Sequence, residues 1–313
     1  MSILSRERNA KFGVFGGCRM NWKRVIEERF PGLIAKVREE IGNSEKNYEI
    51  QNGNDGSAES RLWEHTTHVA SLAFRLALAE KRHPVLPALA ALFHDAGKFA
   101  GGRYHAENTI EEEESAAAAK RILGDTGIKP AELAKTLAGI KALYNEKAPK
   151  NSIAAIVHDA DFLSKFGTMG VAAFFTKAAL RGRTIEGAML GYLSKELTYA
   201  ACLPENMRTA AGKKLAEQKA RDTIRFFRKL LKELGESGVG GLRISRLRIS
   251  DPRSRKRRLE ILLAESRECR NCGSSWQSAW FTEDGVKCTK LNVEWHCADC
   301  GDSLQTSFCL PEV

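Results

Sequence analysis

The spacing of apolar residues predicts helices over most of the chain. Apolar positions recur at helical spacing from residue 22 to 41, and because Pro31 interrupts this segment, it forms either one helix or two shorter ones. Further helices are predicted over residues 69–77, 86–93, 116–123, 130–144, 152–166, 171–178, 185–203 and 207–234. Strand-like alternation is nearly absent between residues 58 and 235, so we predict an all-α bundle there.

The pattern changes after a glycine-rich stretch at residues 235–241. Residues 242–245 and 247–250 both read Leu-Arg-Ile-Ser, and residues 291–297 also alternate, which indicates strands. We therefore predict a mostly α protein with an N-terminal extension (1–57), a helical domain (58–235), a basic linker (236–259) and a small β-rich module (260–313).

Charge adds a second feature to this division. The chain has 313 residues and a formal net charge of +10, and eight basic residues but only one acidic residue lie between Arg243 and Arg258. This segment is either a solvated linker or a surface with affinity for polyanions such as nucleic acid. The sequence shows neither a membrane-spanning apolar run nor a secretory signal, so we expect a cytoplasmic protein without membrane contact.

Four polar residues on or at the end of the predicted helices are of types that bind metal ions. His94 and Asp95 end an apolar helical run, His65 lies on an earlier helix and Asp161 on a later one. Two imidazoles and two carboxylates suit a divalent ion such as Mn, Fe, Ni or Mg. A bound ion lowers the pKa of water and polarises a phosphoryl oxygen, and Lys98 adds a positive charge for a phosphate.

Three short motifs around these residues resemble those of the HD superfamily of metal-dependent phosphohydrolases. They are His65-Thr-Thr-His-Val, Ala91-Leu-Phe-His-Asp-Ala-Gly-Lys and Asp159-Ala-Asp-Phe-Leu. The resemblance implies a helical HD domain over residues 58–235, with His65 rather than His68, and Asp161 rather than Asp159, as metal ligands. It also implies one or two metals and hydrolysis of phosphomonoesters or phosphodiesters, often of nucleotides. Asp95 would both bind metal and help to take a proton from water.

The sequence departs from the superfamily in the region of a second metal. Two-metal members carry extra histidines between the His-Asp pair and the last Asp; here the candidates for a second metal, or for a supporting role beside the ligands, are His105, Glu114 and Asp159. The acidic run at residues 111–114 is otherwise a solvated first turn of a helix, and Asp159 either orients a ligand or lies on the surface.

Six of the eight cysteines lie between residues 269 and 309. Two Cys-x-x-Cys knuckles, each followed by glycine, are separated by 24 residues, a spacing typical of a zinc ribbon. We predict a structural zinc bound by Cys269, Cys272, Cys297 and Cys300. Cys288 and Cys309 remain as a disulfide, as buried thiols or as competing ligands.

Two functions follow from these patterns. The first is metal-dependent hydrolysis of a phosphate ester (a nucleotide, phosphomonoester or phosphodiester) by a metal-activated water. The second is nucleic-acid binding by the zinc module and the segment from Arg243 to Arg258, with the HD domain regulatory or degenerate. A P-loop, a nucleophile elbow and a dinucleotide-binding glycine motif are absent from the sequence, which argues against ATPases, serine hydrolases and nicotinamide-dependent enzymes.

Overall fold

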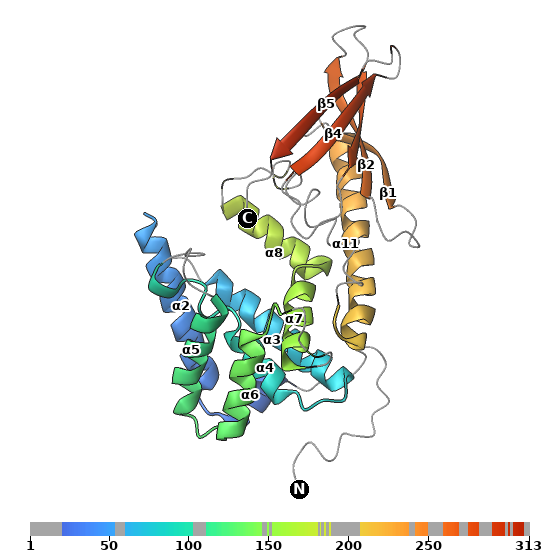
Figure 1. Ribbon diagram of the computed structural model, residues 1–313. Coiled ribbons are helices and arrows are strands. Elements are labelled where there is room, and N and C mark those ends of the chain that lie inside the picture. The colour runs from blue at the N-terminus through green and yellow to red at the C-terminus, as the bar shows by residue number, and fades with distance from the viewer. Residues whose placement is uncertain are drawn as a thin grey trace. The chain divides into compact units, whose positions relative to one another are not determined.

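The computed structural model (Figure 1) describes residues 21–53, 60–102, 111–145, 149, 152–180, 182, 185, 188, 207–237, 242–249, 259–268, 275–281, 290–297, 300 and 303–309. The chain forms two compact units. The first unit comprises Met1–Ser164 and Met207–Gly212, and the second comprises Lys165–Asn206 and Lys213–Val313.

Helices make up the described part of the first unit. They are α1 (Trp22–Arg29), α2 (Leu33–Gln51), α3 (Arg61–Ala79), α4 (Val85–Phe93), the short 3₁₀ helix η2 (Ala100–Gly102), α5 (Glu111–Gly124), α6 (Pro130–Lys141) and α7 (Ile153–Ser164). Helix α4 is apolar all round, and it packs against α3, α6 and α7. A helix without a polar face is stable only when other elements cover it, so α4 is the central helix of this unit.

The helix boundaries follow local sequence signals. The segment around Pro31 divides into α1 and α2, which confirms the interpretation as two shorter helices. Ser60 caps α3 by accepting a hydrogen bond from the backbone N–H of Trp63 at 3.0 Å. The Ser60 hydroxyl also donates to the buried Glu45 of α2 at 2.6 Å. These bonds fix the start of the helix that carries His65.

The described helices of the second unit are α8 (Gly167–Leu180) and most of α11 (Ala210–Ser237), whose first three residues belong to the first unit. The rings of Phe175 and Phe227 stack at a centroid distance of 6.2 Å. The Thr223 hydroxyl accepts a hydrogen bond from the backbone N–H of Gly167 at 2.8 Å. Aromatic contacts of Phe175 and a buried hydrogen bond thus join α8 to α11.

Beyond α11 the chain forms a five-stranded antiparallel sheet in which each strand pairs with the next along the sequence. The strands are β1 (Leu242–Ile249), β2 (Leu259–Glu268), β3 (Ser275–Phe281), β4 (Lys290–Cys297) and β5 (Ser303–Cys309). Strand β1 lies within the segment predicted as a linker, where the Leu-Arg-Ile-Ser alternation indicates a strand. Cys297 ends β4 and Cys300 is exposed, whereas Cys269 and Cys272 lie outside the described residues. The zinc ribbon therefore stays a prediction.

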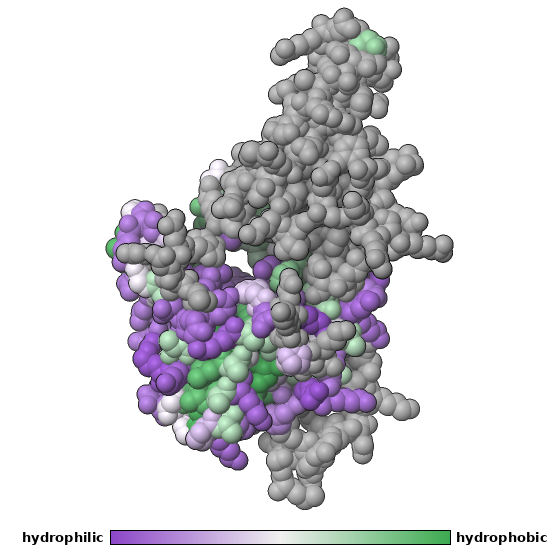
Figure 2. Space-filling view, viewed as in Figure 1, coloured by the Kyte–Doolittle hydropathy of each residue, from purple (hydrophilic) through white to green (hydrophobic). Residues whose placement is uncertain are grey.

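The mostly helical fold is confirmed, and the predicted helices up to residue 180 each correspond to one in the structure. Of the helix predicted over residues 185–203, only residues 185 and 188 are described. The described surface seen in Figure 2 is mostly hydrophilic, and apolar residues gather in one area in the lower middle of the view. Among the described helices, none is both long enough and apolar enough to span a bilayer.

Candidate metal centre

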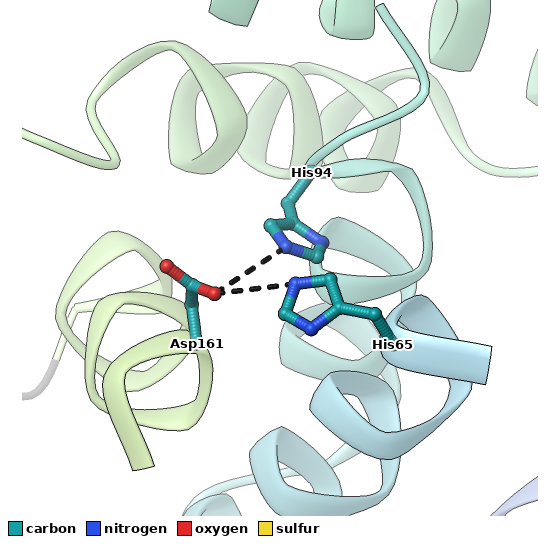
Figure 3. A group of neighbouring side chains, drawn as sticks. All are labelled: His65, His94 and Asp161. Carbon is teal, nitrogen blue, oxygen red and sulfur yellow. Dashed lines mark ion pairs between the residues drawn. The ribbon is translucent and has the colours of Figure 1, made fainter. Parts of the chain in front are cut away.

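Three helices bring His65, His94 and Asp161 together (Figure 3). His65 lies on α3, His94 follows the last residue of α4, and Asp161 lies on α7. Oδ1 of Asp161 is 3.3 Å from Nε2 of His65 and 3.9 Å from Nε2 of His94. One potential ligand atom from each residue lies within 4.8 Å of the others.

Asp95 completes the group. Its Oδ2 is 3.5 Å from Nε2 of His65, and its Oδ1 is 3.5 Å from Nε2 of His94. The structure therefore brings together all four residues that the sequence predicts as metal ligands.

A tight turn after α4 presents the His-Asp pair. The hydroxyl of Ser115 on α5 donates to the backbone carbonyl of His94 and accepts from the backbone N–H of Gly97, both at 2.9 Å. A Cβ atom at position 97 would lie only 2.5 Å from the Ser115 nitrogen and 2.7 Å from the Glu111 carbonyl oxygen. Position 97 thus requires glycine, because the turn and α5 approach each other at backbone distance.

The hydrogen bonds of His94 define its tautomer. Nδ1 lies 2.7 Å from the backbone carbonyl oxygen of Ala91, which accepts hydrogen bonds only, so Nδ1 carries the proton. Nε2 then presents a lone pair to the carboxylates of Asp95 and Asp161. Burial lowers the pKa of His94, although the two carboxylates act in the opposite direction, so the imidazole is neutral at pH 7.

Nε2 of His94 is buried and makes no hydrogen bond within the described part of the chain. A buried polar atom without a partner is costly, and a neutral imidazole nitrogen is a common metal ligand. This nitrogen is the strongest structural sign that the group of four residues accommodates a cation.

The hydroxyl of Tyr144 lies 3.4 Å from Oδ2 of Asp161, while Oδ1 faces the two imidazoles. Desolvation of the hydroxyl, together with the nearby charges of Asp161 and Asp95, holds the pKa of Tyr144 far above its usual range. Tyr144 therefore stays protonated and donates to Asp161. This bond orients the carboxylate so that one oxygen is directed to the cluster.

Lys98 and Glu111 extend the site beyond the four predicted ligands. The ammonium of Lys98 is 2.9 Å from Oδ2 of Asp95 and 3.8 Å from a carboxylate oxygen of Glu111. Burial alone would raise the pKa of Asp95, but its electrostatic interactions with His94 and Lys98 outweigh burial and hold that pKa well below its usual range. Asp95 is therefore a carboxylate at neutral pH, as a metal ligand must be.

The cluster has a buried floor and a partly exposed rim. The side chains of His94, Asp95 and Asp161 are at most 6% exposed. Those of His65, Lys98 and Glu111 are 23–27% exposed, and Tyr144 is about half exposed. Solvent and small molecules thus reach the group from the side of these rim residues.

The donor set fits a divalent ion. Around an ion with ligand bonds of roughly 2.1 Å, neighbouring ligand atoms are about 3 Å apart. The nitrogen-to-oxygen distances between the imidazoles and the carboxylates are 3.3–3.9 Å, close to that separation. Two nitrogens and up to four carboxylate oxygens suit Mn, Fe, Ni or Mg.

The three candidates for a second metal have different outcomes. His105 lies outside the described residues. Glu114 is exposed on α5 and lies outside the group of His65, His94 and Asp161, so its role stays a prediction. Glu111, from the same acidic run, is the residue near Lys98 and Asp95 instead. Successive helical residues point about 100° apart, so only some of four adjacent acids face the cluster.

Asp159 also has a different role from the one predicted. Its carboxylate accepts hydrogen bonds from the backbone N–H groups of Arg208 and Thr209, at 2.9 and 2.8 Å, and from the Thr209 hydroxyl at 2.7 Å. Thr209 in turn caps α11 by accepting from the backbone N–H of Gly212. Asp159 therefore anchors the start of α11. It does not face the cluster as Asp161 does, because residues two apart on a helix point to nearly opposite sides.

Ser115, Tyr144 and Ser164 are site residues that the sequence reasoning missed. Ser164 lies one turn after Asp161 on α7, and its hydroxyl is 3.4 Å from Nδ1 of His65. The i,i+3 spacing of Ser164 from Asp161 was a usable signal. Ser115 and Tyr144 come from segments whose distance from the ligands only the tertiary fold reveals.

Residues 62–165 match the family model described as the HD domain. This range includes all four proposed ligands, so the similarity to the HD domain covers the candidate metal centre. The chain is also similar to solved structures of other proteins. An HD-superfamily hydrolase from Bacillus thuringiensis is 20% identical over 68% of this chain and 98% of its own, with a TM-score of 0.47.

Two further structures have comparable similarity. A predicted HD superfamily hydrolase from an uncultured Thermotogales bacterium is 21% identical over 68% of this chain and 99% of its own, with a TM-score of 0.47. YpgQ of Bacillus subtilis in complex with ADP is 21% identical over 64% of this chain and 96% of its own, with a TM-score of 0.43. None of the curated proteins matches the chain.

Proposed function

We propose that this HD domain is a metal-dependent phosphohydrolase that cleaves the phosphate ester of a small molecule or nucleotide. The observation that carries the proposal is the buried Nε2 of His94, which faces two carboxylates and has no hydrogen-bond partner among the described residues. A cation between these groups would satisfy the nitrogen and neutralise the carboxylates.

The ligands in this proposal are Nε2 of both histidines and the carboxylates of Asp95 and Asp161. The proposed ion is Mn, Fe, Ni or Mg, because these metals accept mixed nitrogen and oxygen ligands. When bound, such an ion supplies Lewis acidity, which makes water a better nucleophile and polarises a phosphoryl oxygen.

The residues of the rim bind and orient the substrate in this proposal. Lys98 presents a partly exposed ammonium next to Asp95, so it supplies positive charge for a phosphate oxygen. Asp95 stays ionised and orients the attacking water through a carboxylate oxygen. Hydrolysis adds the water oxygen to phosphorus and breaks the bond between phosphorus and the ester oxygen. The two protons of water are shared between the leaving alcohol and the released phosphate.

The C-terminal module has a supporting role in this proposal. A closed four-cysteine site stabilises a small fold without taking part in chemistry. We therefore assign to the module a structural zinc held by Cys269, Cys272, Cys297 and Cys300. No described feature of the sheet favours a second catalytic function.

The test is phosphate release by the full chain. The substrates are nucleotides, simple phosphomonoesters and short oligonucleotides, each with Mn, Mg, Fe or Ni. The site variants are Asp161→Asn and Asp95→Ala, and the matched control is Asp125→Asn, which removes an exposed carboxylate elsewhere in the first unit. We expect metal-dependent release that both site variants lose and the control retains. Release that survives in folded Asp161→Asn would overturn the site, and an absence of release with every metal would overturn the function.

A further inference from the structure

The exposed side of α11 carries a stripe of basic residues, Lys214, Arg221, Arg225 and Lys232, which we call the α11 stripe. The four positions follow one another at intervals of seven, four and seven residues. At 3.6 residues per turn, these intervals keep all four within about 40° of one line along the helix. With a rise of 1.5 Å per residue, the stripe is about 27 Å long.

Acidic residues of α11 flank the stripe without interrupting it. Glu217, Asp222 and Glu233 lie about 60° to 100° from its line. Gln218 is the other exposed side chain between the ends of the stripe, and Glu236 lies close to the same line one turn after Lys232. Arg225 pairs with Asp222 at 3.3 Å, and Lys232 pairs with Glu236 at 3.5 Å. The two basic side chains are 78% and 75% exposed, and ion pairs of such exposure contribute little, so a phosphate can replace the acidic partner.

The opposite side of α11 is already buried. Ala216, Ala220 and Phe227 are at most 7% exposed. A helix that binds a lipid surface inserts its apolar side between the lipids, and α11 has no such side to offer. Phe226 is 37% exposed but lies about a third of a turn from the stripe. The stripe therefore lacks the adjoining apolar side with which an amphipathic helix inserts into a membrane.

We infer that the α11 stripe binds the phosphate backbone of a nucleic acid. Lysine and arginine in a row match the regular phosphates of a polynucleotide, and the net charge of +10 attracts such a polyanion at long range. At 3.4 Å per nucleotide, the stripe extends along about eight nucleotides of one strand. This binding goes beyond the proposed hydrolysis and requires no metal.

The test measures fluorescence anisotropy of labelled 20-mer oligonucleotides, single-stranded and duplex, without added metal and at several salt concentrations. The stripe variant replaces its four residues with glutamine. The matched control makes the same change at two arginines and two lysines exposed on helices of the first unit: Arg24, Arg38, Lys120 and Lys135. All eight positions are exposed, so both variants are expected to fold.

We expect wild type and the control to bind both oligonucleotides. For the duplex, the plot of log affinity against log salt is expected to be less steep in the stripe variant, by about 3 to 4 in slope, because each phosphate contact contributes about 0.9. An unchanged slope, or an equal fall in the control, would overturn the inference. Binding to anionic vesicles but not to oligonucleotides would overturn it in favour of a membrane.

The Asp161→Asn variant separates this inference from the proposed hydrolysis. We expect it to bind oligonucleotides as wild type does, whatever its activity. Loss of binding in this variant would place the polyanion at the metal centre and would overturn the role of the stripe.

Discussion

The hydroxyl of Ser164 lies 3.4 Å from Nδ1 of His65. The same hydroxyl donates its only hydrogen to the backbone carbonyl of Asp161 at 2.7 Å, so it accepts from the imidazole. Nδ1 of His65 therefore carries the proton, and Nε2 is directed to the cluster with its lone pair. His94 has the same tautomer, which its bond to Ala91 sets. Both imidazoles thus direct an Nε2 lone pair to the cluster, which is the orientation that a metal ligand requires.

Ser164→Ala is expected to lower the affinity for Mn²⁺ by roughly tenfold or more, as loss of a bond that orients a ligand commonly does. The affinity is measured by calorimetric titration of the metal alone. Ser164→Thr keeps the hydroxyl and is expected to restore most of the affinity. Equal affinities in wild type and Ser164→Ala would show that the hydroxyl does not set the tautomer.

Tyr144→Phe is expected to weaken metal binding several-fold while leaving the melting temperature nearly unchanged. The ring is about half exposed and remains in place, so the change removes only the bond to Asp161. The same titration, run beside thermal unfolding, tests this prediction. A large fall in melting temperature with unchanged affinity would assign Tyr144 to packing rather than to orientation of Asp161.

Gly97→Ala is expected to destabilise the first unit by about 1–3 kcal/mol, the usual cost of overpacking, because the new Cβ meets the backbone of α5. Gly124→Ala is the matched control: position 124 ends α5, and its Cβ would meet nothing within 4 Å. There the change is expected to be neutral or slightly stabilising. Urea unfolding measures both free energies. Equal values for the two variants would contradict the close approach at Gly97.

Asp159 and Asp161 are expected to give opposite results when changed to Asn. Asp159→Asn weakens three hydrogen bonds at the start of α11 and is expected to cost about 2 kcal/mol of stability, with hydrolysis retained in the folded protein. Asp161→Asn is expected to abolish hydrolysis at little cost in stability, because it relieves repulsion with Asp95. Urea unfolding and phosphate release are measured on both variants to test whether one loses stability and the other loses activity. Loss of activity in stably folded Asp159→Asn would return that residue to the metal centre.

The sequence by itself determined the helical architecture and the four residues of the candidate metal centre. Pro31 divides α1 from α2, and the uniformly apolar α4 becomes the central helix because no polar face is available to solvent. His65, His94, Asp95 and Asp161 were predictable because each lies in a short motif whose residue types suit a divalent ion.

Only the tertiary structure decided which neighbouring residues support those ligands. Glu111 rather than Glu114 lies near Lys98 because of the rotation of α5 about its axis. Four consecutive acidic residues do not indicate that rotation in the sequence. The role of Asp159 depends on Arg208 and Thr209, which lie some 50 residues further along the chain. Tyr144 meets Asp161 because α6 packs beside α7. Contacts between segments distant in sequence arise from packing, so they cannot be predicted from the spacing of residues along the chain.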